Sequence, residues 1–240
     1  MKHKISAVIM TLAMAAVCMT GCLDSDKKSS SNQTEQTESA ATEAAEPVTD
    51  ENGEEMSESM ELLRIVFMDI PEAESGPLIK LSKTEAKPGE IAKVTVSVTG
   101  ADKKWNMCGI HITYPDVLEC QIENEEDLTV EYEIGNAAKK NAAFIAMDWQ
   151  KNLPEELIRE HKRSVFFTTM FQDKVAGNDG DIATFFFKVP NDAQPGTVYD
   201  LGYYFNYTDA AKDMFRDIDL DNSFEKYAFE HLEGGSITVR

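Results

Sequence analysis

The residues best suited to bind a metal ion lie together in one short acidic segment. Asp217, Asp219 and Asp221 occupy alternate positions. Aspartates at the first, third and fifth positions begin a calcium-binding loop, because their oxygens can converge on one ion. The sixth position, however, is Asn222 rather than glycine, and the twelfth is Ala228 rather than a bidentate glutamate. Half of the motif is missing, so we interpret the segment as a solvated acidic loop and predict no cofactor for this chain.

Residue types that perform enzyme catalysis are few and dispersed. The four histidines are His3, His111, His161 and His231, and no two have the spacing of a metal-binding pair. The sequence has neither a Gly-x-Ser-x-Gly nucleophile motif nor a phosphate-binding loop. Nearby carboxylates of the kind that glycosidases use arise by chance in a chain with 43 acidic residues. We therefore predict that the protein is not an enzyme.

One cysteine is placed for covalent modification. A basic start precedes an apolar run, Ile5 to Val17, which is too short to span a membrane stably and is typical of a secretory signal. The signal ends in Met19-Thr-Gly-Cys22, which resembles a bacterial lipobox with Met in place of the usual Leu. That motif implies a lipoprotein signal peptide at residues 1–21 and lipidation of Cys22. The alternative is an ordinary signal peptide that is cleaved nearby.

The net charge is distributed unevenly. The chain has 23 basic and 43 acidic residues, for a formal net charge of −20, which disfavours nucleic acid as a partner. Residues 22–61 are acidic, rich in Ser, Thr and Glu, and free of aromatic residues, so they cannot bury enough apolar surface to fold. We predict a disordered stalk that holds a secreted domain at the cell surface, attached to the bacterial membrane through the lipid.

From residue 62 onward, short apolar runs alternate with turn residues. Strands with a period of two are predicted at Ile91–Thr99 and Trp105–Tyr114. Further strands are predicted at residues 117–122, 128–134, 142–149, 164–172, 181–189, 198–206 and 236–240. Short helices are predicted at 152–163 and 208–216, and residues 62–70 form either a strand or a short helix. The pattern indicates an all-β domain at 62–240, an antiparallel jelly-roll β-sandwich of about nine strands with one or two short helices and a core from about residue 77.

Alternation assigns faces to two of these strands. In the predicted strand Trp105–Tyr114, the apolar inner set is Cys108, Ile110, Ile112 and Tyr114, which leaves an outer set of Met107, Gly109, His111 and Thr113. In the strand predicted at residues 142–149, we expect Ala143, Ile145, Met147 and Trp149 to face inward and Phe144, Ala146 and Asp148 to face outward. In residues 164–172 both faces are apolar, so the facing stays open. The outer sets either line a solvated face or form an interface.

Four blocks in order resemble the cohesin domains of cellulosomes. They are Pro88–Val98, Cys108–Glu119, Gly180–Val189 with the turn at Gln194–Thr197, and Glu233–Val239. Together they span about residues 77–240. The order Tyr114-Pro115-Asp116 departs from the Tyr-Asp-Pro turn of the family. The predicted helices resemble those of the more elaborate cohesins.

The resemblance implies a non-catalytic sandwich, one sheet face of which binds a dockerin, a small module with paired calcium loops. It makes the outer sets partner-binding residues, namely Met107, Gly109, His111, Thr113, Phe144, Ala146 and Asp148. We expect a monomeric, lipid-anchored module that captures dockerin-bearing glycan-degrading enzymes or scaffold components in a cellulosome-type assembly, with calcium in the partner. The alternative is a carbohydrate-binding lipoprotein, whose aromatic candidates are Tyr203, Tyr204, Phe205 and Tyr207.

Overall fold

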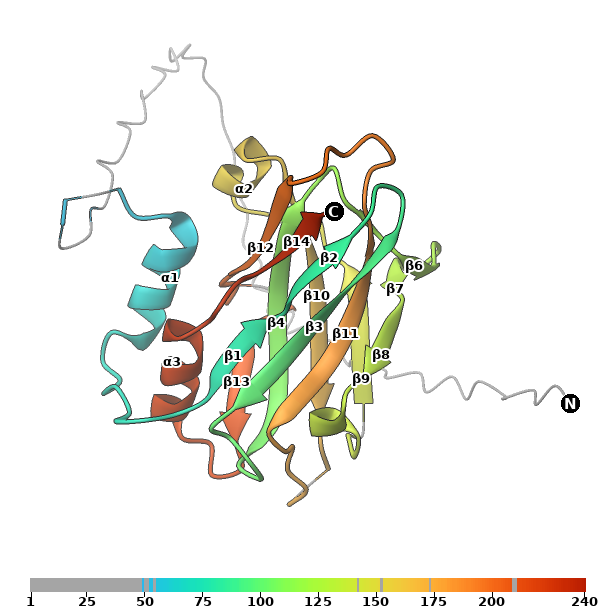
Figure 1. Ribbon diagram of the computed structural model, residues 1–240. Helices are drawn as coiled ribbons and strands as arrows, with labels where there is room; N and C mark the ends of the chain where they lie inside the picture. The colour runs from blue at the N-terminus through green and yellow to red at the C-terminus, as the bar shows by residue number, and fades with distance from the viewer. Residues whose placement is uncertain are drawn as a thin grey trace, which may run out of the picture. The chain divides into compact units, whose positions relative to one another are not determined.

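The computed structural model describes residues 49, 52, 53, 55–141, 143–151, 153–172, 174–208 and 211–240. The predicted signal peptide, Cys22 and most of the predicted stalk lie outside these residues. The described strands form two sheets, and Figure 1 shows β3 and β11 of one sheet in front of β4 and β10 of the other. This arrangement confirms the prediction of an all-β sandwich with few short helices.

The smaller sheet has five strands and is centred on β3 and β11. Its strands are β1 (Leu78–Leu81), β3 (Ile91–Thr99), β11 (Gly180–Lys188), β5 (Glu119–Cys120) and β8 (Tyr132–Ile134). The order is β1-β3-β11-β5, and β8 also pairs with β11. In β3 every second residue from Ala92 to Val98 is buried, as its alternating sequence predicts.

The larger sheet has nine strands. In spatial order these are β2 (Lys83–Ala86), β14 (Gly235–Val239), β12 (Val198–Tyr204), β4 (Trp105–Pro115), β10 (Lys162–Met170), β9 (Ala143–Asp148), β7 (Thr129–Val130) and β6 (Ile122–Asn124), and β13 (Met214–Asp217) also pairs with β4. The pair of β14 with β2 is parallel, and the other pairings of named strands are antiparallel.

The core lies between the two sheets and is rich in aromatic rings. Phe167 of β10 and Phe185 of β11 are fully buried with ring centroids 5.6 Å apart, and Tyr114 of β4 lies 5.0 Å from Phe187. Cys108 and Cys120 are both buried and free, and they pack in the core as small apolar residues.

The helical elements are α1 (Glu58–Phe67), η1 (Asn136–Ala138), α2 (Glu155–Arg159) and α3 (Asn222–Glu230). Helix α1 settles the open choice for residues 62–70 and begins ahead of the predicted domain start. Phe67 packs against Phe205 and Phe229 of α3, with centroids 5.8 and 6.4 Å apart, so α1 and α3 lie together beside the sandwich (Figure 1). Within the described residues, no helix has the length and hydrophobicity that crossing a membrane requires.

The helix predicted at 152–163 is present as the shorter α2, whereas the helix predicted at 208–216 is wrong. The described end of that segment forms β13, which pairs with β4 and places Phe215 5.7 Å from the buried ring of Trp105. Tertiary pairing therefore overrides the local helix preference. The helix comes later, as α3, where the Asp221 carboxylate accepts a hydrogen bond from the Ser223 main-chain N–H at 2.8 Å.

Two substitutions on adjacent strands test the facing of the larger sheet. Phe167→Ala should lower the free energy of unfolding by about 3–5 kcal/mol, because it removes a fully buried ring and leaves a cavity. Ile145→Ala on β9 should change it by only about 0.5 kcal/mol, because that side chain is 51% exposed. Urea unfolding followed by circular dichroism measures both. Similar losses for the two variants would show that Ile145 faces the core.

Candidate partner-binding face

Three neighbouring strands, β4, β10 and β9, present one face of the larger sheet away from the core, which we term the outer face. Its register forms three rows, which are Met107–Met170–Ala143, Gly109–Thr168–Ile145 and His111–Phe166–Met147. On the other side of β4, Met214 of β13 pairs with Gly109, and Tyr204 of β12 pairs with His111. Side chains from five strands therefore meet on this face.

The first two rows of the outer face are open. They border a shallow cavity of about 220 Å³, the methionine groove, which is lined by Met107, Ala143, Ile145, Thr168, Thr169, Met170 and Met214. Met170 is 44% exposed and Ile145 51% exposed. Gly109 forms the covered floor beside it, since a Cβ there would lie 3.3 Å from the Lys212 carbonyl oxygen and 3.4 Å from Met214 Cγ. The result is an exposed apolar depression built mainly of methionine.

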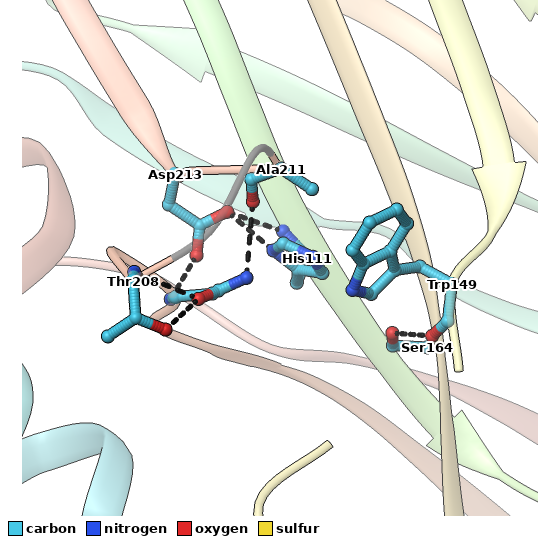
Figure 2. A network of polar contacts seen from close by, with 7 residues as sticks. His111, Trp149, Ser164, Thr208, Ala211 and Asp213 are labelled. Carbon is cyan, nitrogen blue, oxygen red and sulfur yellow. Dashed lines mark hydrogen bonds and ion pairs between the residues drawn. The ribbon is translucent and has the colours of Figure 1, made fainter. Parts of the chain in front are cut away.

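In the third row, His111 and Phe166 are closed to solvent, whereas Met147 is half-buried. His111 is fully buried, and its ring lies between those of Phe166 and Tyr204, with centroids 4.6 Å away in both cases. Trp149, which follows β9, adds an edge contact at 6.0 Å, and Figure 2 shows its ring beside His111. The Ser164 hydroxyl donates to the Trp149 carbonyl oxygen and so fixes the segment that carries this ring.

A buried carboxylate holds this closed half together. On this edge of β4, the pairing with β12 ends at Tyr204, opposite His111, and the pairing with β13 begins at Met214, opposite Gly109. The ladder is therefore interrupted next to His111. The Asp213 carboxylate fills the interruption. Its Oδ1 accepts from the His111 main-chain N–H at 3.0 Å and from Nδ1 at 2.8 Å, and its Oδ2 accepts from the Asn206 N–H at 2.8 Å (Figure 2).

The electrostatics of the His111–Asp213 pair follow from its burial. Burial raises the pKa of the Asp213 carboxyl above its usual range, and the hydrogen bond and charge of His111 oppose that rise. Both Asp213 oxygens already accept main-chain N–H groups, so we assign the proton between the two side chains to Nδ1 of His111. Both side chains are essentially inaccessible to solvent, so the pair stabilises the face and offers no atom to a partner.

The predicted outer set of β4 is therefore correct in its facing and partly wrong in its exposure. Met107 lines the methionine groove. Gly109, His111 and Thr113 point outward as predicted but are buried, the last at 4% exposure. Alternation along one strand specifies the face, and it contains no information on the segments that fold over that face.

The facing predicted for β9 is wrong. Phe144 stacks on the core ring of Phe167 with centroids 5.7 Å apart, Ala146 is fully buried, and Asp148 is 9% exposed. The reason is the register with β10, in which these three residues align with Thr169, Phe167 and Val165, all of which are buried. The outward residues are Ala143, Ile145 and Met147. The same register settles the facing that the sequence left open for β10.

Asp148 has a structural role at the inner edge of the sandwich. Its carboxylate accepts a hydrogen bond from the Tyr114 hydroxyl at 3.1 Å and forms an ion pair with Arg163 at 2.7 Å. Burial raises the pKa of the Tyr114 hydroxyl, so this group stays a protonated donor. Asp148 thus satisfies buried polar groups and does not reach the outer face.

The acidic segment considered for metal binding has another role. Asp217 accepts the Asp221 N–H at 2.7 Å, and Asp221 caps α3, where hydrogen bonds from Ser223 lower the pKa of its carboxyl. Asp219 is exposed. In the part of the chain that the structure describes, no group of three or more His, Cys, Asp or Glu side chains is placed to hold a metal ion. The aspartates serve turn and helix formation.

The aromatic residues considered for carbohydrate binding do not form an exposed platform. Tyr204 and Phe205 are buried at 4% and 6% exposure, and Tyr203 and Tyr207 are half-buried. Phe205 stacks on Tyr207 with centroids 5.8 Å apart and also contacts Phe67. These rings join α1 and α3 to the sandwich instead of presenting flat faces to a sugar.

A two-sheet sandwich with an open apolar sheet face is typical of protein-binding modules. The model of the Cohesin domain matches residues 78–214, more than half of the chain. The chain therefore belongs to the cohesin domain family, whose domain is a protein-binding module and not an enzyme. No curated protein matches the chain.

Comparison with solved structures finds other cohesin modules. The chain is similar to a type III cohesin module from the cellulosomal ScaE cell-surface anchoring scaffoldin of Ruminococcus flavefaciens, with 23% identity, a TM-score of 0.57, and coverage of 70% of this chain and 89% of that one. It also matches a cohesin in a type I cohesin–dockerin complex from Clostridium thermocellum, with 16% identity, a TM-score of 0.48, and coverage of 69% and 100%. It further matches a type I cohesin from Pseudobacteroides cellulosolvens, with 20% identity, a TM-score of 0.48, and coverage of 69% of this chain and 92% of that one.

The His111–Asp213 pair yields a stability prediction. Asp213→Ala should lower the free energy of unfolding by about 3 kcal/mol or more, because three buried N–H groups lose their acceptor. Asp213→Asn keeps one acceptor oxygen and should cost less. Asp219→Ala, which removes the same charge from an exposed position, should cost about 0.5 kcal/mol or less. Equal urea midpoints for the two alanine variants would contradict the role of the pair.

Proposed function

We propose that this protein is a lipid-anchored cohesin that captures dockerin-bearing proteins at the cell surface through its methionine groove. The observation that carries the proposal is an exposed, mainly apolar depression on the outer face of the larger sheet in a cohesin domain. Exposed apolar patches of this kind mark interaction sites. Dockerin recognition is the function that the cohesin family implies for such a face.

The chemistry of the groove fits a helical partner. Methionine side chains are unbranched and polarisable, so they adapt their shape to an apolar helix surface. Met107, Met170 and Met214 come from three strands and line the depression together with the small side chain of Ala143. Because His111 and Phe166 are closed to solvent, the proposed centre of contact lies on the first two rows.

The methionine groove accounts only for the centre of an interface. A standard protein interface buries roughly 1,600 Å² in total, most of it in a polar rim around a few energetically dominant residues. Met170 and Ile145 are the two large apolar side chains of the groove with the greatest exposure. We therefore assign the dominant contacts to these two residues, in place of the buried His111, Ala146 and Asp148 and the inward-facing Phe144.

Attachment to the membrane is proposed from the sequence of residues 1–61. Lipidation at Cys22 would leave 35 residues before α1, with a reach of roughly 35 Å as a flexible coil and at most about 120 Å when extended. The similar cohesin module from Ruminococcus flavefaciens belongs to a cell-surface anchoring scaffoldin. A stalk of this length would let a monomeric module meet partners clear of the membrane. Dockerin-bearing glycan-degrading enzymes or scaffold components are the partners that we propose.

Charged substitutions in the groove test the binding face. Met170→Glu and Ile145→Glu should each weaken dockerin binding by about tenfold or more, because a carboxylate would be buried against an apolar helix. Ile91→Glu is the matched control, since Ile91 is equally exposed but lies on β3 of the other sheet. Calorimetry against a broad dockerin panel with calcium present measures the affinities.

Two outcomes would overturn the proposed function. One is the absence of binding to every dockerin of the panel, above all if a glycan array gives a positive result instead. The other is equal loss for all three glutamate variants, which would place the contact elsewhere.

Chelation of calcium should abolish binding without changing the urea midpoint of this chain, because the calcium is expected in the partner.

Removal of the thiol tests the anchor. Cys22→Ser should move the protein from the detergent phase to the aqueous phase in a Triton X-114 partition of expressing bacteria, because no diacylglyceryl group can be attached. Cys120→Ser is the control, since that thiol is buried in the domain. Continued partition of the Cys22→Ser protein into detergent would contradict lipidation at this residue.

A further inference from the structure

The methionine groove brings the thioether side chains of three methionines to one cavity. Met107, Met170 and Met214 belong to three different strands, β4, β10 and β13, and all three line the same cavity. Met170 is 44% exposed, and Met107 and Met214 are half-buried. Solvent therefore has access to a group of thioethers at the centre of the proposed contact.

We propose that the methionine groove is a site of oxidative modification, in which peroxides convert its thioethers to sulfoxides and thereby weaken partner binding. The effect on binding rests on the proposed function, whereas the modification itself does not. The thioether sulfur attacks one peroxide oxygen, so that an S–O bond forms while the O–O bond breaks. The sulfur is oxidised by two electrons, and hydrogen peroxide is reduced to water.

The surroundings of the sulfurs explain why this reaction matters. A sulfoxide oxygen is a strong hydrogen-bond acceptor that is satisfied by water while the groove is open. The groove offers it mainly apolar neighbours, such as Ala143 and Ile145. A docked partner would exclude water and leave few donors for these oxygens, of which the groove lining supplies the Thr168 hydroxyl, and an unpaired buried oxygen is costly. We expect binding to weaken by about tenfold or more for an oxidised groove.

The chain contains its own control methionines. Met60 and Met68 on and just after α1 are 53% and 64% exposed, more than any methionine of the groove. Neither lines the methionine groove. They should oxidise at least as fast as Met170, and their oxidation should leave binding unchanged. The comparison separates a local effect in the groove from general oxidative damage.

The experiment uses the full chain treated with increasing hydrogen peroxide. Peptide mass spectrometry measures the sulfoxide at each methionine, and calorimetry measures binding of a dockerin that the untreated chain binds. One variant carries Met107→Leu, Met170→Leu and Met214→Leu, which keep the volume and apolar character of the groove. The other carries Met60→Leu and Met68→Leu. Circular dichroism confirms that both are folded.

We expect the wild type and the Met60/Met68 variant to lose binding in step with sulfoxide at Met170, and the triple-leucine variant to retain it after the same treatment. Methionine sulfoxide reductases should restore binding to the wild type. Full affinity with Met170 completely oxidised would overturn the proposal. So would the absence of sulfoxide at Met170 when Met68 is fully oxidised.

A failure of the proposed function would be recognised separately, because the untreated chain would then bind no dockerin. The sulfoxide pattern would still test the modification. Binding of an apolar fluorescent dye, compared between the oxidised wild type and the oxidised triple-leucine variant, would test whether the groove has become polar. Equal dye binding by the two would overturn the proposal without any dockerin.

Discussion

The outer face depends on the way β4 is paired along its length. One edge of β4 is continuous with β10, but its other edge meets two successive strands, first β12 and then β13. The interruption between them exposes a main-chain N–H in the middle of a sheet, which must find an acceptor. Asp213 supplies it and binds the ring of His111 with the same oxygen. One side-chain carboxylate thus takes the place of a main-chain hydrogen-bond acceptor that the sheet lacks at this point.

This replacement divides the outer face into two halves with different physical properties. Where Asp213 and the rings of Phe166 and Tyr204 surround His111, the surface is filled and rigid. Beyond Gly109 no such filling exists, and the methionine groove remains open. The closed half stabilises the sheet, whereas the open half is free to vary in sequence without loss of the core. The surface that we propose for recognition and the buried pair that stabilises the sheet therefore lie in adjacent rows of the same strands.

The sequence predicts the sandwich well because alternation is strongest where one face is core. In Trp105–Tyr114 the inner set is uniformly apolar, and its facing is right. In β9 the more hydrophobic set, with Ile145 and Met147, faces outward, whereas the inward set includes the carboxylate of Asp148. Hydrophobicity alone then selects the wrong face. The register with β10 is what determines it, and register is a relation between strands far apart in the chain.

The candidate site is less predictable for the same reason. His111 is buried by Asp213, which lies 102 positions later, and Met214 reaches the groove only because its segment forms a strand where local preferences favour a helix. The aspartates of the acidic loop show the converse, since a local motif suggested a metal ion while the fold uses two of them for a turn and a helix cap.

The charge of the chain acquires a different meaning once the groove is located. The formal net charge of the chain is −20. Residues 23–61 contribute 12 acidic residues against two lysines, and most of these residues precede α1. The groove itself contains no ionisable side chain and is made of methionine, alanine, isoleucine and threonine. The surface that we propose for recognition is therefore apolar, and oxidation of its three sulfur atoms is the change in polarity that we propose for it.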